Sequence, residues 1–209
     1  MVADTFTMNI RSGPRHDLSA PTDAQLARRV QRGHTSDLAP LVERHHSPLL
    51  GFLYCLTGGD RPLAEDLTQE TFLRALRSIQ QYQTSRPFKS WLYAIAVNVA
   101  RDHFKRAETR HAVTLTDDEL LALPDPIDLE ETIEIDGPRL ALAISTLPGQ
   151  QREAILLRYY QDLSLAEMAS VLSIPIGTVK SRLSLGLRQL RLSLKDEAVC
   201  HTSMNSARN

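Results

Sequence analysis

The sequence contains little of what disulfide-bonded, zinc-binding or membrane-spanning proteins require. Among its 209 residues are two cysteines, Cys55 and Cys200, which lie far apart and form no CxxC pair. This argues against a disulfide framework and a structural zinc site, and it fits a reducing cytosol. No apolar run reaches the ~18 residues of a membrane span, and the N-terminus has no apolar signal core. We therefore expect a cytoplasmic protein with no direct membrane insertion.

Motifs that carry catalysis are also missing. The sequence has no HExxH, no nucleophile motif and no glycine-rich phosphate loop. His45 and His46, beside Glu43 and near Cys55, come nearest to a set of metal ligands. Adjacent residues on a helix point about 100° apart, however, so the two imidazoles do not readily share one ion. We expect no enzyme activity, no catalytic residue, no metal and no cofactor.

The net charge of −1 conceals a separation of charge along the chain. Residues 111–138 contain no Lys or Arg and nine Asp or Glu. The segment before them has 15 Lys or Arg against 11 Asp or Glu, and the segment after them has nine against five. The acidic stretch also contains three prolines. It is therefore interpreted as a linker between two mildly basic units, and the basic units keep a nucleic-acid partner open.

Both basic segments have the apolar spacing of helices, and no useful period-2 alternation occurs. Thr22 with Gln25, and Ser164 with Glu167, have the spacing of capping boxes. We therefore predict an all-α protein with two small helical domains joined by a flexible acidic linker. The expected boundaries are 1–21 for a disordered N-terminal tail, 22–112 for the first domain, 113–138 for the linker, 139–195 for the second domain and 196–209 for a C-terminal tail.

Two helices expected in the first domain have charged faces, which could be exposed to solvent or could bind a partner. The helix expected at about 62–79 has an apolar stripe of core residues, namely Leu67, Thr71, Phe72, Ala75, Leu76 and Ile79. The helix expected from about residue 87 has a core stripe that runs from Trp91 to His103. Its basic end fits the helix dipole or a phosphate-facing role equally well.

The second domain ends in a helix-turn-helix pattern. In "SIPIGTVKSRL", residues 173–183, a short turn precedes a basic helix with Val179 as its expected buried anchor. Ser173 takes the turn position at which glycine is commonest. Gly177 costs the helix about 1 kcal/mol relative to alanine, which is explained if its backbone approaches a DNA phosphate or base edge. The alternative is an αα-hairpin with a flexible joint.

These stretches resemble the extracytoplasmic-function (ECF) sigma factors of bacterial RNA polymerase. "LPGQQREAILLRYYQDLSLAEMASVLSIPIGTVKSRL" looks like their region 4, and "AEDLTQETFLRALRSI" with "PFKSWLYAIAVNVARDHFKR" looks like their region 2. The resemblance implies an alternative sigma factor that binds core polymerase and directs promoter-specific initiation by recognising −35 and −10 elements. It also implies a sigma region 2 helical bundle and a sigma region 4 helix-turn-helix as the two domains.

The resemblance also implies a role for residues at the matching positions. For the −35 element these are Gly177, Thr178, Lys180, Ser181, Arg182, Ser184 and Arg188. For the −10 element they are Trp91, Asn98, Arg101, Asp102, Lys105 and Arg106, with Tyr93 nearby. For binding to core polymerase they are Asp66, Gln69, Glu70 and Arg74.

The implied partners are core RNA polymerase, through its β′ clamp helices and β flap, promoter DNA, and an anti-sigma factor. A rival interpretation is a helix-turn-helix transcriptional regulator that acts independently of core polymerase. Such a regulator would have a sensing domain or a dimerisation helix upstream, and residues 22–110 have the pattern of neither.

Overall fold

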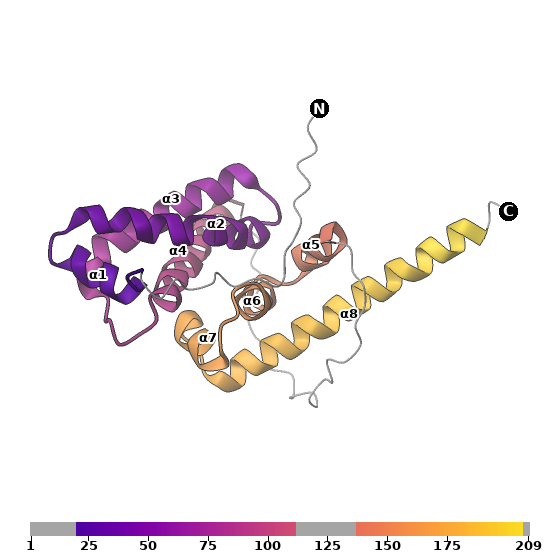
Figure 1. The fold of residues 1–209 in the computed structure, drawn as a ribbon. Helices are drawn as coiled ribbons and strands as arrows, with labels where there is room; N and C mark the ends of the chain where they lie inside the picture. Colours follow the sequence, from indigo (N-terminus) through magenta and orange to yellow (C-terminus); the bar gives the residue numbers. More distant parts are fainter. Residues whose placement is uncertain (1–19, 112–136, 207–209) are drawn as a thin grey trace.

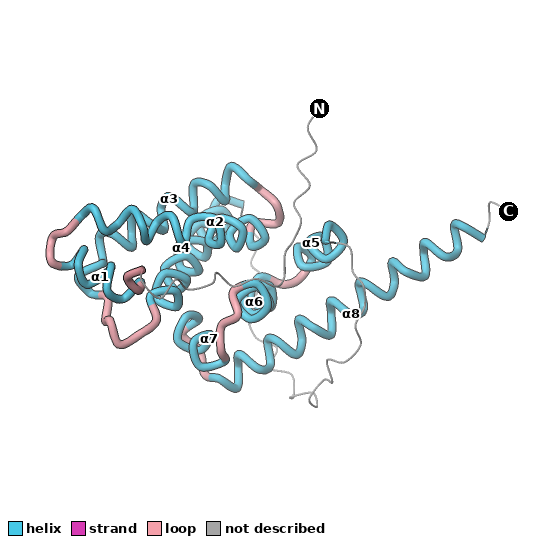
Figure 2. The backbone as a smooth tube through the Cα atoms, viewed as in Figure 1, coloured by secondary structure: helices cyan, strands magenta, loops and turns pink. Residues whose placement is uncertain are grey.

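The computed structural model describes residues 20–111 and 137–206, and within these ranges it contains helices and turns but no strand (Figure 2). The first domain consists of α1 (Asp23–Gln31), α2 (Leu38–Leu56), α3 (Arg61–Ser78) and α4 (Phe88–His111), with single 3₁₀ turns at Thr35–Asp37 and Ile79–Gln81. The second consists of α5 (Gly137–Thr146), α6 (Gly149–Ile155), a π-helical turn (Leu156–Tyr160), α7 (Leu165–Leu172) and α8 (Ile176–Ser206) (Figure 1). The predicted all-α fold is confirmed.

Some expectations concern segments at or beyond these limits. The predicted N-terminal tail and acidic linker lie almost wholly outside the described residues. At the other end, α8 continues to Ser206, into the segment expected to be a C-terminal tail. Among the described residues, no helix is both long enough and apolar enough to cross a membrane.

The helix starts follow the local signals in the sequence. Both capping boxes form: the Thr22 hydroxyl accepts from the backbone N–H of Gln25, and the Ser164 hydroxyl accepts from that of Glu167. The Asp60 carboxylate caps α3 by accepting from the Leu63 N–H at 3.0 Å. Such caps satisfy N–H groups that have no partner inside the helix.

The core of the first domain forms where α4 packs against α2 and α3. Phe52 of α2 and Tyr93 of α4 are fully buried and meet edge to face at a centroid distance of 5.1 Å. The stripe expected on α4 was too long, because His103 is exposed and lies against Phe104. Tyr93 and Val97, outside that stripe, are also buried; Tyr93 packs on Phe52 of α2 and lies near Tyr160 of the second domain.

The apolar stripe predicted on α3 is buried except at one residue, Leu76, for which the prediction was wrong. Leu67, Thr71, Ala75 and Ile79 are buried as expected, but the Leu76 side chain is 41% exposed. Leu73, one turn earlier, is 48% exposed. Helical spacing of apolar residues does not by itself tell whether a residue packs in the core of its own domain or stays on the surface.

The second domain is organised around the helix-turn-helix formed by α7 and α8. Met168 and Leu172 of α7 and Val179 of α8 are buried, which confirms Val179 as the anchor. Ser173 has φ +57° and ψ +42°, so a serine adopts the left-handed conformation that glycine usually supplies in this turn. α6 packs on α8 at Gly186, where an added Cβ would lie 3.0 Å from a side-chain carbon of Ile155.

The two domains lie against each other. α7 contacts α4, and α5, α6 and the π-helical turn contact α2 (Figure 1). α8 runs along the outer side of the second domain, and its start lies at the α7 turn (Figure 1). The interface therefore involves α4, the helix that carries the −10 candidates.

Candidate nucleic-acid interface

The first turn of α8 contains an exposed glycine, Gly177, just before basic residues of the same helix. Gly177 is the second residue of α8, is exposed, and has open space for 4 Å around the position of a Cβ. No backbone angle of Gly177 requires glycine. Neither the packing nor the backbone conformation of the described residues therefore requires glycine at this position.

The other −35 candidates follow along the first three turns of α8. Gly177, Ser181, Ser184 and Arg188 recur at intervals of four, three and four residues and therefore share one helix face. Lys180 and Arg188 are exposed, whereas Thr178, Ser181, Arg182 and Ser184 are half-buried. The structure thus brings the predicted residues together, with Arg182 and Thr178 to one side of the shared face.

The −10 candidates lie on α4. Asn98, Asp102, Lys105 and Arg106 are exposed, and the first three recur at helical spacing on one face. Trp91, one turn after the start of α4, is half-buried and packs against the rings of Tyr82 and Phe88 at 5.1 and 5.5 Å.

Tyr93, which was considered beside these candidates, is completely buried, so its ring does not reach a ligand in this structure. Burial raises the pKa of its phenol well above the ordinary value, and the nearby Tyr160 acts in the same direction. The Tyr93 hydroxyl remains a neutral, buried group.

Arg101 differs from its neighbours because it already has an anionic partner in the second domain. Its guanidinium donates two hydrogen bonds to the Glu153 carboxylate, at 2.9 and 2.5 Å. Glu153 belongs to α6 and is only 6% exposed. A bidentate pair of this kind is stronger than an exposed ion pair. In this structure the Arg101 guanidinium, which was predicted to face DNA, is therefore held by Glu153.

The candidates for binding polymerase lie on α3 and connect to α4. Asp66 and Gln69 are exposed, and Glu70 is half-exposed. Arg74 binds Glu70 at 2.7 Å and reaches across to Asp102 of α4 at 2.8 Å. These two carboxylates, Asp102 first, raise the pKa of the Arg74 guanidinium. Arg74 therefore holds the two helices in register as well as lining the surface.

A shallow hollow lies between the two sets of candidates. It measures about 330 Å³ and is lined by Arg74, Arg77 and Ser78 of α3 and by Ile95 and Asn98 of α4. The −10 candidate Asn98 and the polymerase candidate Arg74 thus share one concave surface.

Sequence reasoning missed two residues on the same face as the polymerase candidates. Leu73 and Leu76 follow Asp66 and Gln69 at helical spacing, and both leucines are a little under half exposed. The signal in the sequence was that both residues are leucines, and Leu76 was interpreted as a core residue for that reason. The structure places an exposed apolar strip beside the polar candidates.

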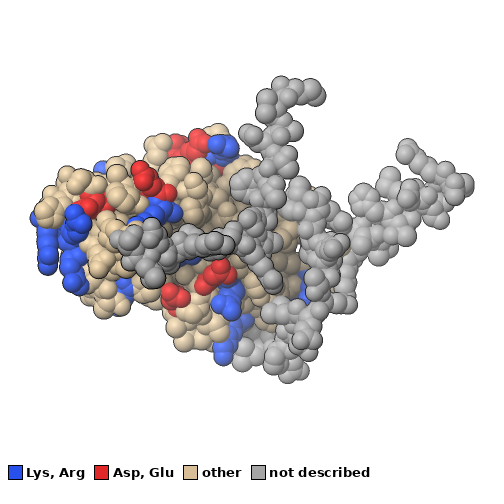
Figure 3. Space-filling model, in the orientation of Figure 1, with Lys and Arg blue, Asp and Glu red and all other residues tan. Residues whose placement is uncertain are grey.

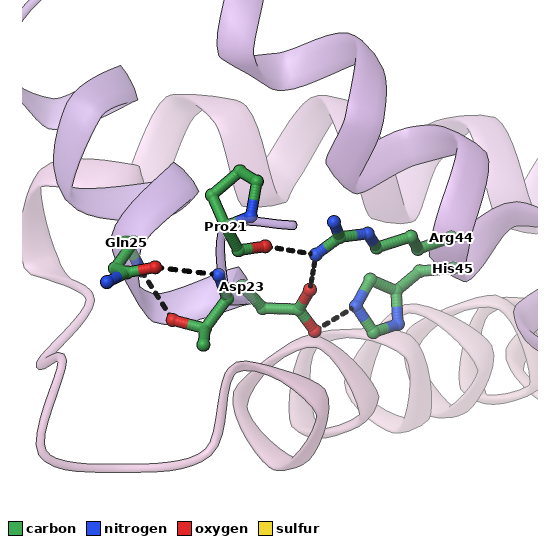
Figure 4. A network of polar contacts seen from close by, with 6 residues as sticks. Pro21, Asp23, Gln25, Arg44 and His45 are labelled. Carbon is green, nitrogen blue, oxygen red and sulfur yellow. Dashed lines mark hydrogen bonds and ion pairs between the residues drawn. The ribbon is translucent and has the colours of Figure 1, made fainter. Parts of the chain in front are cut away.

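The histidines considered as metal ligands serve in separate structural contacts. The imidazole Nε2 of His45 lies 2.7 Å from the Asp23 carboxylate, which also accepts from Arg44 at 2.9 Å (Figure 4). The hydrogen bond with His45, and secondarily that with Arg44, lowers the pKa of Asp23. His46 is exposed and stacks on Phe72 with centroids 6.3 Å apart. The Asp23 network fastens the start of α1 to α2.

Basic side chains gather in more than one place on the molecule. Figure 3 shows Lys and Arg at the α1 end of the first domain and again near the start of α8, with mixed charges between them. The formal net charge of −1 therefore hides two local basic surfaces.

Two family models match the chain. Sigma-70 region 2 matches residues 41–110, and Sigma-70, region 4 matches residues 139–190. The first match covers most of α2 together with α3 and nearly all of α4, and the second covers α5 to the middle of α8.

Curated relatives match over most of their length. The ECF RNA polymerase sigma factor BldN of Streptomyces coelicolor is 34% identical over 190 residues, which cover 88% of this chain and 70% of BldN. The ECF RNA polymerase sigma factor SigW of Bacillus subtilis is 30% identical over 182 residues, which cover 81% of this chain and 95% of SigW.

Two solved structures share the fold. CnrH, in complex with the cytosolic domain of CnrY, has a TM-score of 0.62 at 24% identity, and the match covers 83% of this chain and 97% of CnrH. The sigma factor RpoE of Bartonella quintana, in complex with the anti-sigma factor NepR, has a TM-score of 0.61 at 23% identity, with 76% and 97% covered.

Proposed function

Because the chain belongs to the ECF sigma factors and is an alternative sigma factor that directs transcription initiation with RNA polymerase, we propose how its two domains divide the work. The second domain places the start of α8 in the major groove of the −35 element. The first domain uses the exposed face of α4 at the −10 element and the face of α3 on core polymerase. We further propose that the protein acts in the cytoplasm by binding DNA and polymerase, without catalytic activity of its own.

The observation that carries the −35 assignment is the exposed Gly177 at the start of a basic helix. Backbone N–H groups in the first turn of a helix have no internal partner and favour an anion. A glycine leaves them accessible, while Lys180 and Arg188 stand exposed on the same part of α8. Lys and Arg supply phosphate contacts and the commonest contacts to guanine.

At the −10 element the proposed surface is the exposed face of α4 with Asn98, Asp102, Lys105 and Arg106. Asn98 lines the hollow beside Arg77, so an amide and a guanidinium are available to the edge of an unpaired base. Extracting a base costs a few kcal/mol, which hydrogen bonds and stacking offset. Trp91 acts here mainly through packing, since Tyr82 and Phe88 surround it.

On core polymerase the proposed contact is the α3 face, which combines polar and apolar groups. Asp66 and Gln69 give orientation and partner choice, whereas Leu73 and Leu76 supply apolar area that desolvates on binding. The clamp helices of β′ are the proposed partner of this face, and the β flap is the proposed partner of the second domain.

An anti-sigma factor is a further proposed partner. RpoE was solved with the anti-sigma factor NepR, and this chain shares its fold. The rival interpretation, a regulator that acts without core polymerase, gains no support from any of these relatives.

Run-off transcription with core polymerase on a promoter library tests the proposed function. We expect the purified chain to confer initiation from templates with defined −35 and −10 elements, and loss of either element to abolish it. Initiation that ignores both elements, or none at all, would contradict the proposal. Co-purification with core polymerase separates the sigma factor from the rival regulator.

A further inference from the structure

Two stretches of the sequence that lack acidic residues come together at the α1 end of the first domain. Residues 24–36 contain three Arg and no Asp or Glu, and residues 71–101 contain five Lys or Arg and no Asp or Glu. At the chain's average of 25 acidic residues in 209, segments of this combined length would contain about five. Charge is therefore segregated within the first domain itself.

Hydrogen bonds hold the two stretches side by side. The Gln31 amide of α1 donates to the carbonyl of Ile79 at 2.7 Å. The Arg28 guanidinium of the same helix donates to the Thr84 hydroxyl at 2.8 Å. The end of α1 and residues 79–87, which lead into α4, therefore form one continuous surface.

This surface carries three guanidinium groups, those of Arg28, Arg32 and Arg86. All three residues are exposed, and none of them forms an ion pair with a carboxylate within residues 20–111 and 137–206. The Asp37 carboxylate, which follows α1 in the sequence, pairs with Arg29 at 2.9 Å. The surface therefore keeps a net positive charge, and Figure 3 shows Lys and Arg gathered at this end of the molecule.

The dipole of α1 accounts for only part of this arrangement. Cations near the C-terminus of a helix are favoured by the dipole, which is a sufficient reason for Arg28 and Arg32. Arg86, however, lies in the loop before α4. Its carbonyl accepts from the Tyr82 hydroxyl at 2.7 Å, and its N–H donates to the Gln83 carbonyl at 3.0 Å. The loop backbone is therefore fixed where it presents the third guanidinium.

The backbone of a nucleic acid matches the chemistry of this surface. Gln80, Gln83 and Ser85 are exposed on the same loop, and neutral donors together with Arg are typical of contacts to phosphate and sugar. The aromatic residues beside them, Tyr82 and Phe88, are buried, so they offer no platform on which a base stacks. We therefore expect contacts to phosphates, without readout of the bases.

The surface adjoins the part of α4 that is proposed to act at the −10 element. Residues 79–87 lead directly into α4, and Asn98 lies about 15 Å along that helix from Phe88. A DNA strand advances about 3.4 Å per nucleotide. A strand that runs from Asn98 toward the start of α4 therefore reaches the surface within about five nucleotides.

We propose that Arg28, Arg32 and Arg86 form a phosphate-binding surface for the single-stranded non-template strand next to the −10 element. The inference rests on the proposed action of α4 at that element. The surface adds affinity for any base sequence, whereas the exposed face of α4 supplies the preference for the −10 element. Because the surface binds the strand once it has separated from its complement, it shifts the promoter toward the melted state.

The test uses Arg32→Gln and Arg86→Gln, separately and together, in the holoenzyme. The template is a fork, in which an upstream duplex with the −35 element continues as a single-stranded non-template strand through and beyond the −10 element. Each lost phosphate contact lowers the slope of log affinity against log salt by about 0.7 on a single strand. Between about 50 and 200 mM salt, the wild-type affinity should therefore fall about 2.6-fold more than that of either single variant, and about sevenfold more than that of the double variant.

Arg61→Gln is the control that removes the same charge from another place. Arg61 is exposed, pairs with Glu65 and begins α3, about 27 Å of helix away from the Ile79 turn that contacts α1. We expect the wild-type salt slope for Arg61→Gln. On a duplex fragment that ends before the −10 element, every variant should bind as the wild type does. A changed base sequence beyond the −10 element should leave the difference between variants and wild type unaltered.

Equal salt slopes for the wild type and the double variant on the fork would overturn the proposal. A change of the same size on the duplex fragment would overturn it too, because it would indicate the general field of the protein and not a contact. Weaker binding of core polymerase in the absence of DNA would show instead that the surface faces an acidic part of polymerase.

Both substitutions change exposed side chains, so thermal unfolding of the variants should match that of the wild type. If one single variant fails to fold, the salt slope of the other decides the matter. Absence of wild-type run-off transcription would refute the proposed function. Normal wild-type transcription with unchanged salt slopes in the variants would refute only the phosphate-binding surface, so the two failures are distinguishable.

Discussion

The glycine at the start of α8 allows a prediction in which protein stability and DNA binding change in opposite directions. In Gly177→Ala, the new methyl group meets no atom of the chain within 4 Å. The helix gains from losing a glycine in its first turn, and we expect the free energy of unfolding to rise by about 0.5–1 kcal/mol.

DNA binding should weaken in the same variant. If the N–H groups at the α8 start bind a phosphate, the methyl group displaces a hydrogen bond to a charged group, which contributes about 1.5–3 kcal/mol. That corresponds to a loss of roughly 10- to 150-fold in affinity. Thermal unfolding of the free chain gives the first quantity. Fluorescence anisotropy of a labelled promoter fragment with the holoenzyme gives the second.

Gly149→Ala is the matched control. Gly149 is likewise exposed, begins a helix, and has open space at its Cβ position, but it belongs to α6, which is not among the proposed DNA-binding elements. We expect a similar gain in stability with unchanged promoter affinity. Equal promoter affinity for Gly177→Ala and Gly149→Ala would refute the reasoning that the Gly177 backbone approaches DNA.

The turn, the start of α1 and the basic face of α8 give three further predictions. Ser173→Gly should raise the free energy of unfolding by about 0.5–1 kcal/mol, because glycine relieves the left-handed strain but loses more entropy on folding; a lower melting temperature would count against it. Asp23→Asn should cost about 1–2 kcal/mol by weakening the contacts with Arg44 and His45. The pKa of Asp23 is lowered in the folded chain, so the stabilisation that its carboxylate provides is complete above the unfolded-state pKa near 3.9 and is lost as the pH falls through the folded-state pKa. The free energy of unfolding of Asp23→Asn should therefore fall less steeply with pH below about pH 4 than that of the wild type. Equal slopes for the two proteins would contradict this account. Arg182→Ala should weaken −35-dependent binding by about 1–3 kcal/mol, whereas Arg61→Ala, an exposed arginine at the start of α3, should not; footprinting with unchanged base preference for Arg182→Ala would reject the assignment.

Local features of the fold were predictable because their causes lie within a few residues. Both capping boxes, the end of α1 before Gly33 and the unusual turn at Ser173 follow from spacing and from the conformational preferences of single residues. Val179 followed from helical periodicity. The candidate residues on α8 could be grouped for the same reason, since four residues at helical spacing share a face.

Contacts between distant parts of the chain were not predictable. The Arg101–Glu153 pair joins residues 52 positions apart, and the Lys89–Gln161 bond joins residues 72 apart. No periodicity encodes such pairs. α4 packs against α2, α3 and α7 together, so buried residues such as Val97 and Tyr93 lie outside the single stripe that periodicity predicted.

The π-helical turn Leu156–Tyr160 gives the chain one residue more per turn than an ordinary helix would have at this point. The turn closes where the Gln161 backbone N–H donates to the Leu156 carbonyl at 3.1 Å, five residues earlier. The Gln161 carbonyl, which accepts from Lys89 at 2.6 Å, therefore emerges directly after the surplus residue. Deleting one residue from this turn should let it close with ordinary α-helical hydrogen bonds, and a deletion scan through Leu156–Tyr160 would show which position the chain can lose.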